Sequence, residues 1–343
     1  MRKLALYFCL VLMVVACKEQ DEPEPLAVEE VQAANVIVLN EGNFQWANAS
    51  LSLYNEESRK VDNKVFQKNN NNLPLGDVVQ SMVQIGDLGY FVINNSNKIR
   101  VLNLNTFRSE GAIENLNSPR YILPISAQKA YVSDLHEDKI YVVDLSSQSI
   151  LKTIPTQGWT EEMVLLGDKA FVCQMDSNEV LVFDTKKDSL LQRISTYTSP
   201  QYIEVDVNQD VWVSCSGSSN SLAALQKIDA NQLQVVRTMA AQNTNESIGE
   251  IELSPQKNKL YYLTEKGMNQ LSVTDSILPT QPWIASAGRN LYGLSVNPQN
   301  GEIYLCDAID FQQEGVVYRY GENGSLIDQF QVGIIPGDVY FKQ

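Results

Sequence analysis

The sequence is poor in the residues on which many enzymes and nucleic-acid-binding proteins depend. Its one histidine, His136, excludes by counting a metal site built from several histidines. Lysine and arginine number 26 against 41 acidic residues, and no basic patch contains interleaved aromatics, so we expect no nucleic acid partner. No serine lies in a GxSxG context. We therefore expect no catalytic residues and interpret His136 as a solvated loop residue.

Cysteine is also scarce, and its spacing is irregular. Besides Cys9 and Cys17 near the N-terminus, the chain has Cys173, Cys215 and Cys306, with no CxxC pair. Each of these three follows an apolar, β-rich run. We expect them to be buried free thiols that act as small hydrophobic residues.

Long apolar runs are absent except at the N-terminus. Leu4–Ala16 follows two basic residues and is long enough for a signal peptide but too short to span a bilayer. "VVAC", residues 14–17, resembles the lipobox of bacterial lipoproteins, in which the chain is cut before the cysteine. The resemblance implies that residues 1–16 are a signal peptide and that Cys17 is lipidated. An ordinary signal peptide with an incidental cysteine is the alternative.

Residues 17–33 have the composition of a solvated tether. "KEQDEPEPLAVEE", residues 18–30, is acidic, contains two prolines and cannot form a hydrophobic core. An acidic run after a lipobox resembles the surface-export signal of Bacteroidota lipoproteins. This implies a lipid-anchored protein in the outer membrane that faces the cell exterior. A periplasm-facing lipoprotein with an acidic spacer is the alternative.

Residues 34–343 contain a repeat of about 44 residues, a period typical of propellers. Short β-branched and aromatic runs alternate with Gly, Asn, Asp and Ser turns, four runs to most repeats. This pattern predicts an all-β fold, a seven-bladed β-propeller. The matched apolar positions of the seven first strands are Val83, Ile122, Val164, Ile203, Ile251, Leu294 and Val339.

The two ends of the repeat region are incomplete in complementary ways. The first strand at residues 337–341 has nothing after it, whereas "NVIVLN", "SLSLYN" and "KVDNKVFQ" (residues 60–67) are second, third and fourth strands without a first. We expect the C-terminal strand to pair with the N-terminal blade and close the ring, which removes a free strand edge.

Two resemblances follow from these segments. "DKIYVVDLSSQSILKTIPT" and "NEVLVFDTKKDSLLQRIST" resemble the YVTN-type repeats of quinoprotein-like seven-bladed propellers. "LNEGNFQWANASLSLYN", together with "VFQKNNNNLPLGDVVQSM" and "VINNSNKIRVLN", resembles the cobalamin (vitamin B12)-binding surface lipoproteins of Bacteroidota. That resemblance implies a corrinoid ligand, no covalently bound cofactor, and delivery of the ligand to a TonB-dependent outer-membrane transporter.

The second-to-third-strand loops and the connections between blades emerge on one face of a propeller, which we name the entry face; the opposite face is the turn face. The longest predicted insertions, residues 67–80, 280–293 and 306–315, and most exposed-type aromatics fall on the entry face. Aromatics with amides suit a large, flat, amide-bearing ligand. The predicted ligand residues are Asn43, Phe44, Gln45, Trp46, Asn95, Arg120, Asp134, Trp159, Tyr197, Trp283, Tyr292, Asp307 and Phe311.

Two other functions are compatible with these residues. A calcium-dependent, lactonase-like propeller hydrolase would hold its metal with loop residues, for which Glu41, Asn95, Asp134 and Asp307 are available. A surface scaffold for protein interactions would instead have a flat entry face with buried aromatics. Acids and amides at the starts of loops also serve as turn formers.

Overall fold

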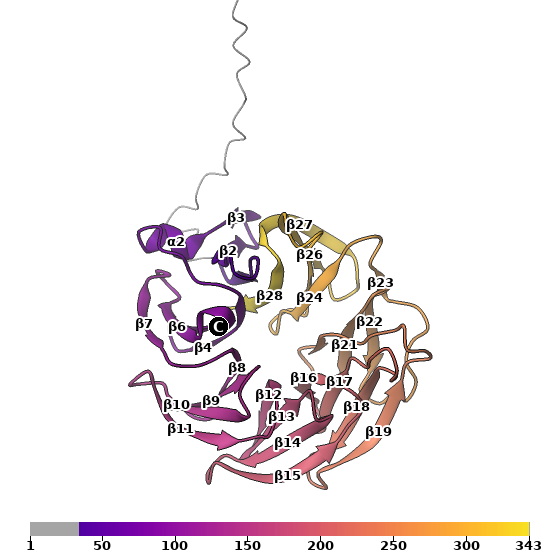
Figure 1. Ribbon diagram of the computed structural model, residues 1–343. Helices are drawn as coiled ribbons and strands as arrows, with labels where there is room; N and C mark the ends of the chain where they lie inside the picture. The colour runs from indigo at the N-terminus through magenta and orange to yellow at the C-terminus, as the bar shows by residue number, and fades with distance from the viewer. Residues whose placement is uncertain (1–33, 343) are drawn as a thin grey trace, which may run out of the picture.

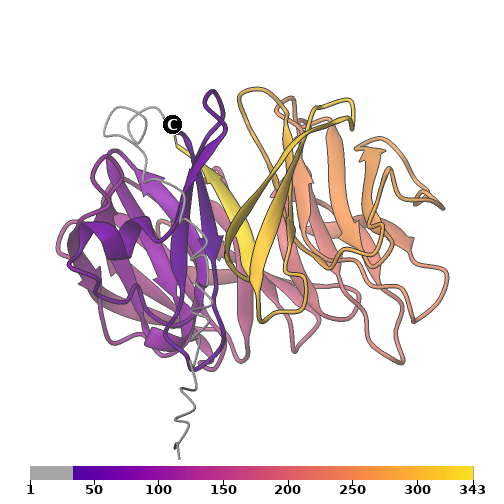
Figure 2. The same cartoon turned by 90° about the horizontal axis from the view of Figure 1, so that it is seen from above.

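The computed structural model describes residues 34–342, which form seven four-stranded antiparallel sheets around a central axis (Figure 1). The strands of each sheet run between the two faces of the ring (Figure 2). Blade 1 contains β28, β1, β2 and β3, and blades 2 to 7 follow in chain order from β4–β7 to β24–β27. The predicted seven-bladed β-propeller is therefore confirmed.

Each blade begins with an innermost strand, and every matched apolar position of the repeat lies in one of them. The innermost strands are β28 (Pro336–Phe341), β4 (Val79–Ile85), β8 (Pro119–Pro124), β12 (Thr160–Leu166), β16 (Pro200–Val205), β20 (Ile251–Leu253) and β24 (Leu291–Val296). Most of them contain a register shift near their entry-face end, where a β-bulge interrupts the pairing with the second strand.

The second strands are almost wholly buried because each blade packs between two others. They are β1 (Val36–Asn40), β5 (Leu88–Ile93), β9 (Lys129–Asp134), β13 (Lys169–Gln174), β17 (Val211–Cys215), β21 (Lys259–Thr264) and β25 (Ile303–Asp307). The third strands are β2 (Ser50–Asn55), β6 (Lys98–Asn103), β10 (Lys139–Asp144), β14 (Glu179–Asp184), β18 (Ala224–Asp229), β22 (Gly267–Ser272) and β26 (Glu314–Tyr320).

The fourth strands form the outer rim and vary most in length. They are β3 (Lys60–Asp62), β7 (Ser109–Ile113), β11 (Ser149–Pro155), β15 (Ser189–Ser195), β19 (Gln234–Ala240), β23 (Ile284–Ala285) and β27 (Leu326–Ile334). The predicted fourth strand at residues 60–67 is wrong in its second half, because the strand ends at Asp62 and residues Val65–Asn69 form the short helix α2. Lys64 adopts a left-handed conformation there, and the helical turn buries Val65 and Phe66.

The hydrophobic core consists of clusters that each join two neighbouring blades rather than one continuous centre. Cys173, Cys215 and Cys306 lie in these clusters as buried free thiols, as the sequence predicts. Side chains of adjacent blades interdigitate, so the ring positions its entry-face loops rigidly.

The predicted ring closure is also confirmed. β28 pairs with β1 along the registers Val36–Phe341, Val38–Val339 and Asn40–Pro336. Yellow β28 consequently lies beside the indigo strands of blade 1 in Figure 1. Blade 1 thus joins both ends of the described chain.

The segments N-terminal to the propeller lie outside the described residues. The predicted signal peptide, Cys17 and the tether up to residue 33 therefore stay predictions. None of the helices within residues 34–342 is long and apolar enough to cross a membrane. A short 3-10 helix, η1 (Asn94–Ser96), forms the loop between β5 and β6.

Candidate functional site

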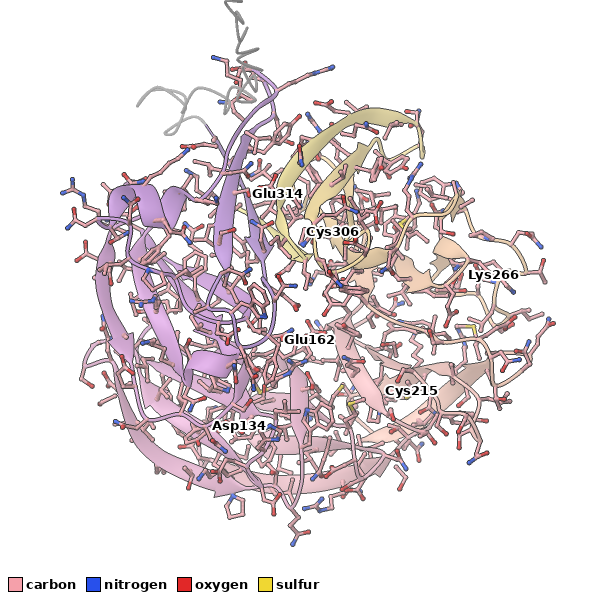
Figure 3. The ribbon with its side chains drawn as sticks, turned by 45° about the horizontal axis from the view of Figure 1, so that its top comes forward. Asp134, Glu162, Cys215, Lys266, Cys306 and Glu314 are labelled. Atoms are coloured by element: carbon pink, nitrogen blue, oxygen red, sulfur yellow. The ribbon has the colours of Figure 1, made fainter. Side chains whose placement is uncertain are left out.

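A cavity of about 710 Å³ occupies the centre of the ring, and residues of all seven blades line it. The innermost strands form its walls, and loops of the entry face form its mouth. We call it the central cavity. Its charged lining consists of the acids Glu41, Glu162, Glu250, Glu252, Glu265 and Asp338 and the bases Arg120 and Arg289. Figure 3 shows Glu162 at the centre of the ring.

The mouth contains an ion pair between Arg120 on β8 and Glu161 on β12. Arg120 Nε lies 3.1 and 3.0 Å from the two carboxylate oxygens of Glu161, and its Nη1 donates to Gln80. Trp159 donates its indole N–H to the same carboxylate. Glu161 is fully buried, and burial raises its pKa although Arg120 and Trp159 stabilise the carboxylate. The guanidinium of Arg120 is therefore already committed to protein partners.

A second carboxylate, Glu41, lies at the mouth on the loop that follows β1. Tyr292 on β24 donates its hydroxyl to Glu41, at 3.2 Å from each carboxylate oxygen. Burial raises the pKa of Glu41 to about 7, whereas Arg120 and the Tyr292 hydrogen bond lower it and Asp338 raises it. Glu41 is thus poised to change charge near neutral pH.

The hairpin at residues 41–49 rises from this point and is attached to blade 7. Asn43 donates its amide to the carbonyl of Phe311 at 2.6 Å, and the Phe311 ring meets Tyr292 edge to face at 5.4 Å. The backbone N–H of Asn43 is bonded in turn to the side chain of Asn48 at 2.7 Å. These contacts gather Glu41, Asn43, Tyr292 and Phe311 at one side of the mouth.

Two aromatic side chains project from the tip of the hairpin. Phe44 is 61% exposed and Trp46 is 75% exposed. Gln45 between them has a φ of 69°, and the N–H of Trp46 bonds to the carbonyl of Asn43, so a tight turn holds both rings outward. Large rings held in water beside a cavity are typical of a recognition surface.

The chain matches one family profile over residues 35–335, a domain of unknown function, DUF5074. The chain belongs to the DUF5074 family. No curated protein sequence matches it.

Several solved structures share the fold of this DUF5074 chain. One is a quinonprotein alcohol dehydrogenase-like protein from Bacteroides thetaiotaomicron, at 15% identity over 91% of this chain and 78% of that one, with a TM-score of 0.73. A protein from Lactobacillus plantarum matches at 14% identity over 90% and 100% of the two chains, with a TM-score of 0.69. A functionally unknown protein from Desulfotomaculum acetoxidans matches at 12% identity over 90% and 99%, with a TM-score of 0.67. Identities this low show the propeller fold alone.

Some residues that the sequence predicts to bind ligand already use their polar groups in hydrogen bonds within this DUF5074 chain. Asp134 is fully buried, and its carboxylate accepts the backbone N–H groups of Ser118, His136 and Glu137. Asp307 accepts those of Asn290 and Ile309. Both carboxylates therefore hold loops in place, as turn formers do.

Asn95 and Tyr197 lie on the entry face but do not line the central cavity. Asn95 donates to Asp77 within its own blade at 2.7 Å. Tyr197 is 38% exposed, and its backbone N–H is bound by the side chain of Gln226. Arg120 and Tyr292 are the predicted residues that reach the cavity lining.

Trp283 departs from the expected entry-face position. Its ring lies 6.0 Å from that of Tyr261 and packs against Gly324, which belongs to the β26–β27 turn on the turn face. A Cβ atom at Gly324 would lie 2.9 Å from the indole, so glycine allows this approach. The segment before the short strand β23 thus follows the flank of blade 6.

The acids inside the cavity were not predicted, because they lie in or directly before innermost strands and not in the entry-face loops. Glu250 and Asp338 directly precede the matched apolar position of their repeats, and Glu252 follows it. Acidic residues beside an innermost-strand position were the available signal. Within residues 34–342, no group of three or more His, Cys, Asp or Glu side chains is arranged to hold a metal ion.

Proposed function

We propose that this chain is a binding protein that captures cobalamin or a related corrinoid on its entry face, over the mouth of the central cavity. The observation that carries the proposal is the hairpin at residues 41–49, which holds Phe44 and Trp46 in solvent beside the polar mouth. A corrinoid is a flat ring edged with amides. Exposed rings stack on such a plane, and Asn43, Gln45 and the carboxylates at the mouth pair with amide groups.

Preorganisation supports this proposal. The hairpin is closed by the Asn43–Asn48 contacts and is attached to blade 7 through Phe311, so few side chains must be ordered when a ligand binds. The acids that a calcium-dependent hydrolase would use as metal ligands are already engaged within the protein. Asp134 and Asp307 accept backbone N–H groups of their loops, which counts against a calcium ion held by these two residues.

Titration of the purified chain with cyanocobalamin tests the proposal, with the absorbance of the corrin or the heat of binding as the signal. We expect saturable one-to-one binding, weakened by Trp46→Ala and unaffected by Trp283→Ala, a tryptophan on the flank of blade 6. Absence of binding at micromolar ligand overturns the corrinoid proposal. Lactone hydrolysis that is lost on chelation and in Glu41→Gln would instead support the hydrolase.

The predicted location and partner complete the proposal. We propose that Cys17 carries the lipid anchor, that the protein faces the cell exterior, and that it passes its ligand to a TonB-dependent transporter. Labelling with a fatty acid in cells, compared with Cys17→Ala, tests lipidation, and protease digestion of intact cells tests exposure. Retention of such a transporter on the immobilised chain, stronger with cyanocobalamin present, tests the partner.

A further inference from the structure

Three acids in the central cavity accept hydrogen bonds from neutral donors. Glu162 accepts the backbone N–H of Ile203 at 2.8 Å, and Glu250 accepts that of Leu294 at 2.6 Å. Asp338 accepts the hydroxyl of Ser295 at 3.1 Å. In each case the donor lies on the innermost strand of an adjacent blade, so these carboxyl groups bridge neighbouring blades while they line the cavity.

The carboxyl group of Glu252 has fewer protein partners than those of Glu162, Glu250 and Asp338. It lines the same cavity, and no side chain or backbone group of residues 34–342 gives it a hydrogen bond or an ion pair. Glu252 is half-buried, so its carboxyl group is accessible from the cavity. Its open hydrogen-bonding capacity points to a donor that comes from outside the chain.

The bases near the cavity do not neutralise these acids. Arg120 is bound to Glu161 and Gln80 at the mouth. Arg289 also lines the cavity, but its guanidinium stacks over Tyr318 at 4.1 Å and donates to Tyr320. Lys257 is exposed in the turn after β20 on the turn face. The interior of the cavity thus has acids without a matching cation.

Two tyrosine rings complete the lining. Tyr121 on β8 and Tyr202 on β16 border the cavity, and no described residue bonds to their hydroxyl groups. Aromatic faces and carboxyl groups in one enclosure attract cationic and N–H-bearing groups, and the carboxylates repel an anion when they are ionised.

We propose that the central cavity selects ligands by charge, admitting a group that donates hydrogen bonds without negative charge, such as a carboxamide or an ammonium, and rejecting carboxylates and phosphates. This inference rests on the proposed function where it concerns corrinoids: amide side chains enter, whereas the same side chains hydrolysed to carboxylates do not. Repulsion between the cavity carboxylates and an anionic group of the ligand provides the specificity.

The selection is expected to increase with pH. Burial raises the pKa of Glu162, Glu250 and Glu252 well above the usual range. Repulsion from Asp338 raises all three further, and repulsion from Glu204 on β16 raises the pKa of Glu162 and Glu252. A protonated carboxyl group still pairs with an amide. An ionised one repels an anion as well, so rejection of anions becomes stronger as these groups lose their protons.

A reporter thiol tests the charge selection without any corrinoid. Gln201→Cys places a thiol in the cavity lining, and Ser146→Cys places one in an exposed turn as the matched control. Each is reacted with a cationic trimethylammonioethyl and an anionic sulfonatoethyl methanethiosulfonate. The unmodified chain, whose three described cysteines are buried, serves as the blank.

The measured quantity is the ratio of the cationic to the anionic reaction rate. We expect this ratio to be at least about tenfold larger in the cavity than in the exposed turn, to rise between pH 6 and pH 8.5, and to fall when Glu162→Gln and Glu252→Gln are added. Equal ratios at the two positions overturn the proposal.

A second measurement separates this inference from the proposed function. Cyanocobalamin is compared with its monocarboxylate, in which one amide is hydrolysed, and we expect binding of the monocarboxylate to be about tenfold weaker. If neither corrinoid binds but the thiol ratio persists, the corrinoid proposal fails and charge selection stands. If both bind equally and the ratio is absent, charge selection fails and the corrinoid proposal stands.

Discussion

The Trp46→Ala variant gives the sharpest separation between recognition and folding. Trp46 is 75% exposed at the tip of the hairpin, whereas Trp212 is fully buried, donates to Asp206 and lies beneath Lys227. Substitution by alanine is therefore expected to affect ligand binding at Trp46 and the stability of the fold at Trp212. At Trp46 it removes a surface available to a ligand, and at Trp212 it removes part of the core between blades 5 and 6.

The exposed area sets the size of the effect. A tryptophan buries about 150–250 Å² when fully covered, so roughly 150 Å² of Trp46 remains for a ligand to contact. A flat ligand covers about half of that, which at about 25 cal/mol per Å² contributes about 2 kcal/mol. We expect dissociation constants to rise about 30-fold, since about 1.4 kcal/mol corresponds to a factor of ten. The free energy of unfolding should fall by at most about 1 kcal/mol, against about 3–5 kcal/mol for Trp212→Ala.

Calorimetric titration with cyanocobalamin and urea denaturation of the same preparations measure the two quantities. Phe44→Ala should behave as Trp46→Ala does, with a smaller loss of affinity because its ring is smaller and less exposed. A loss of several kcal/mol of stability in Trp46→Ala, or unchanged affinity in a stable Trp46→Ala chain that binds corrinoid, would refute the reasoning.

Three further outcomes are expected. Arg120→Met leaves the buried carboxylate of Glu161 unpaired and should lower the free energy of unfolding by about 3–5 kcal/mol in urea, with most of it recovered in the double variant that also carries Glu161→Met; no recovery would contradict the pairing. Because the pKa of Glu41 is about 7 when folded against an ordinary 4.5, the folded state holds the extra proton between these values, so this group's effect on stability becomes less favourable as pH rises through that window. The melting temperature should therefore decline less from pH 5 to pH 8 in the Glu41→Gln variant than in the unmodified chain, and equal declines would contradict the raised pKa of Glu41. Deletion of residues 336–343 removes β28 and should abolish cooperative thermal unfolding, whereas a single sharp transition would show that closure is dispensable.

The repeat made the architecture predictable, because a blade packed between two others needs apolar residues at the same place in every unit. Val83 and Ile203 illustrate this, since both lie in innermost strands although the segments around them have little else in common. The incomplete repeats at the two ends predicted the closure by β28. The prediction that was wrong concerned one short segment, the fourth strand of blade 1. Val65 and Phe66 are as suitable for a strand as for the helix α2, and the left-handed conformation of Lys64 is what ends the extended chain before them.

The site was less predictable because exposure depends on neighbours distant in sequence. Trp46 and Trp283 both lie in polar, loop-like segments, yet the first points into solvent and the second packs on Tyr261 and Gly324. The carboxylates of Asp134 and Asp307 likewise accept hydrogen bonds from the backbone N–H groups of Ser118 and Asn290, and no sequence motif indicates these partners. The pairing of Glu41 with Tyr292 joins residues of blades 1 and 7, which meet only because the ring closes.

The pairing of β28 with β1 also orders events in time. β28 follows every other strand in the chain, so blade 1 lacks its innermost strand until the rest of the propeller has been synthesised. Bringing Val36 to Phe341 closes a loop whose entropic cost is about 5 kcal/mol by the logarithmic rule. Until that step, the inner edge of β1 is unpaired and open to other chains. Contacts at the mouth that join blade 1 to blade 7, such as Glu41 with Tyr292, form when the ring closes, so a chain interrupted before β28 has neither a closed ring nor a complete cavity mouth.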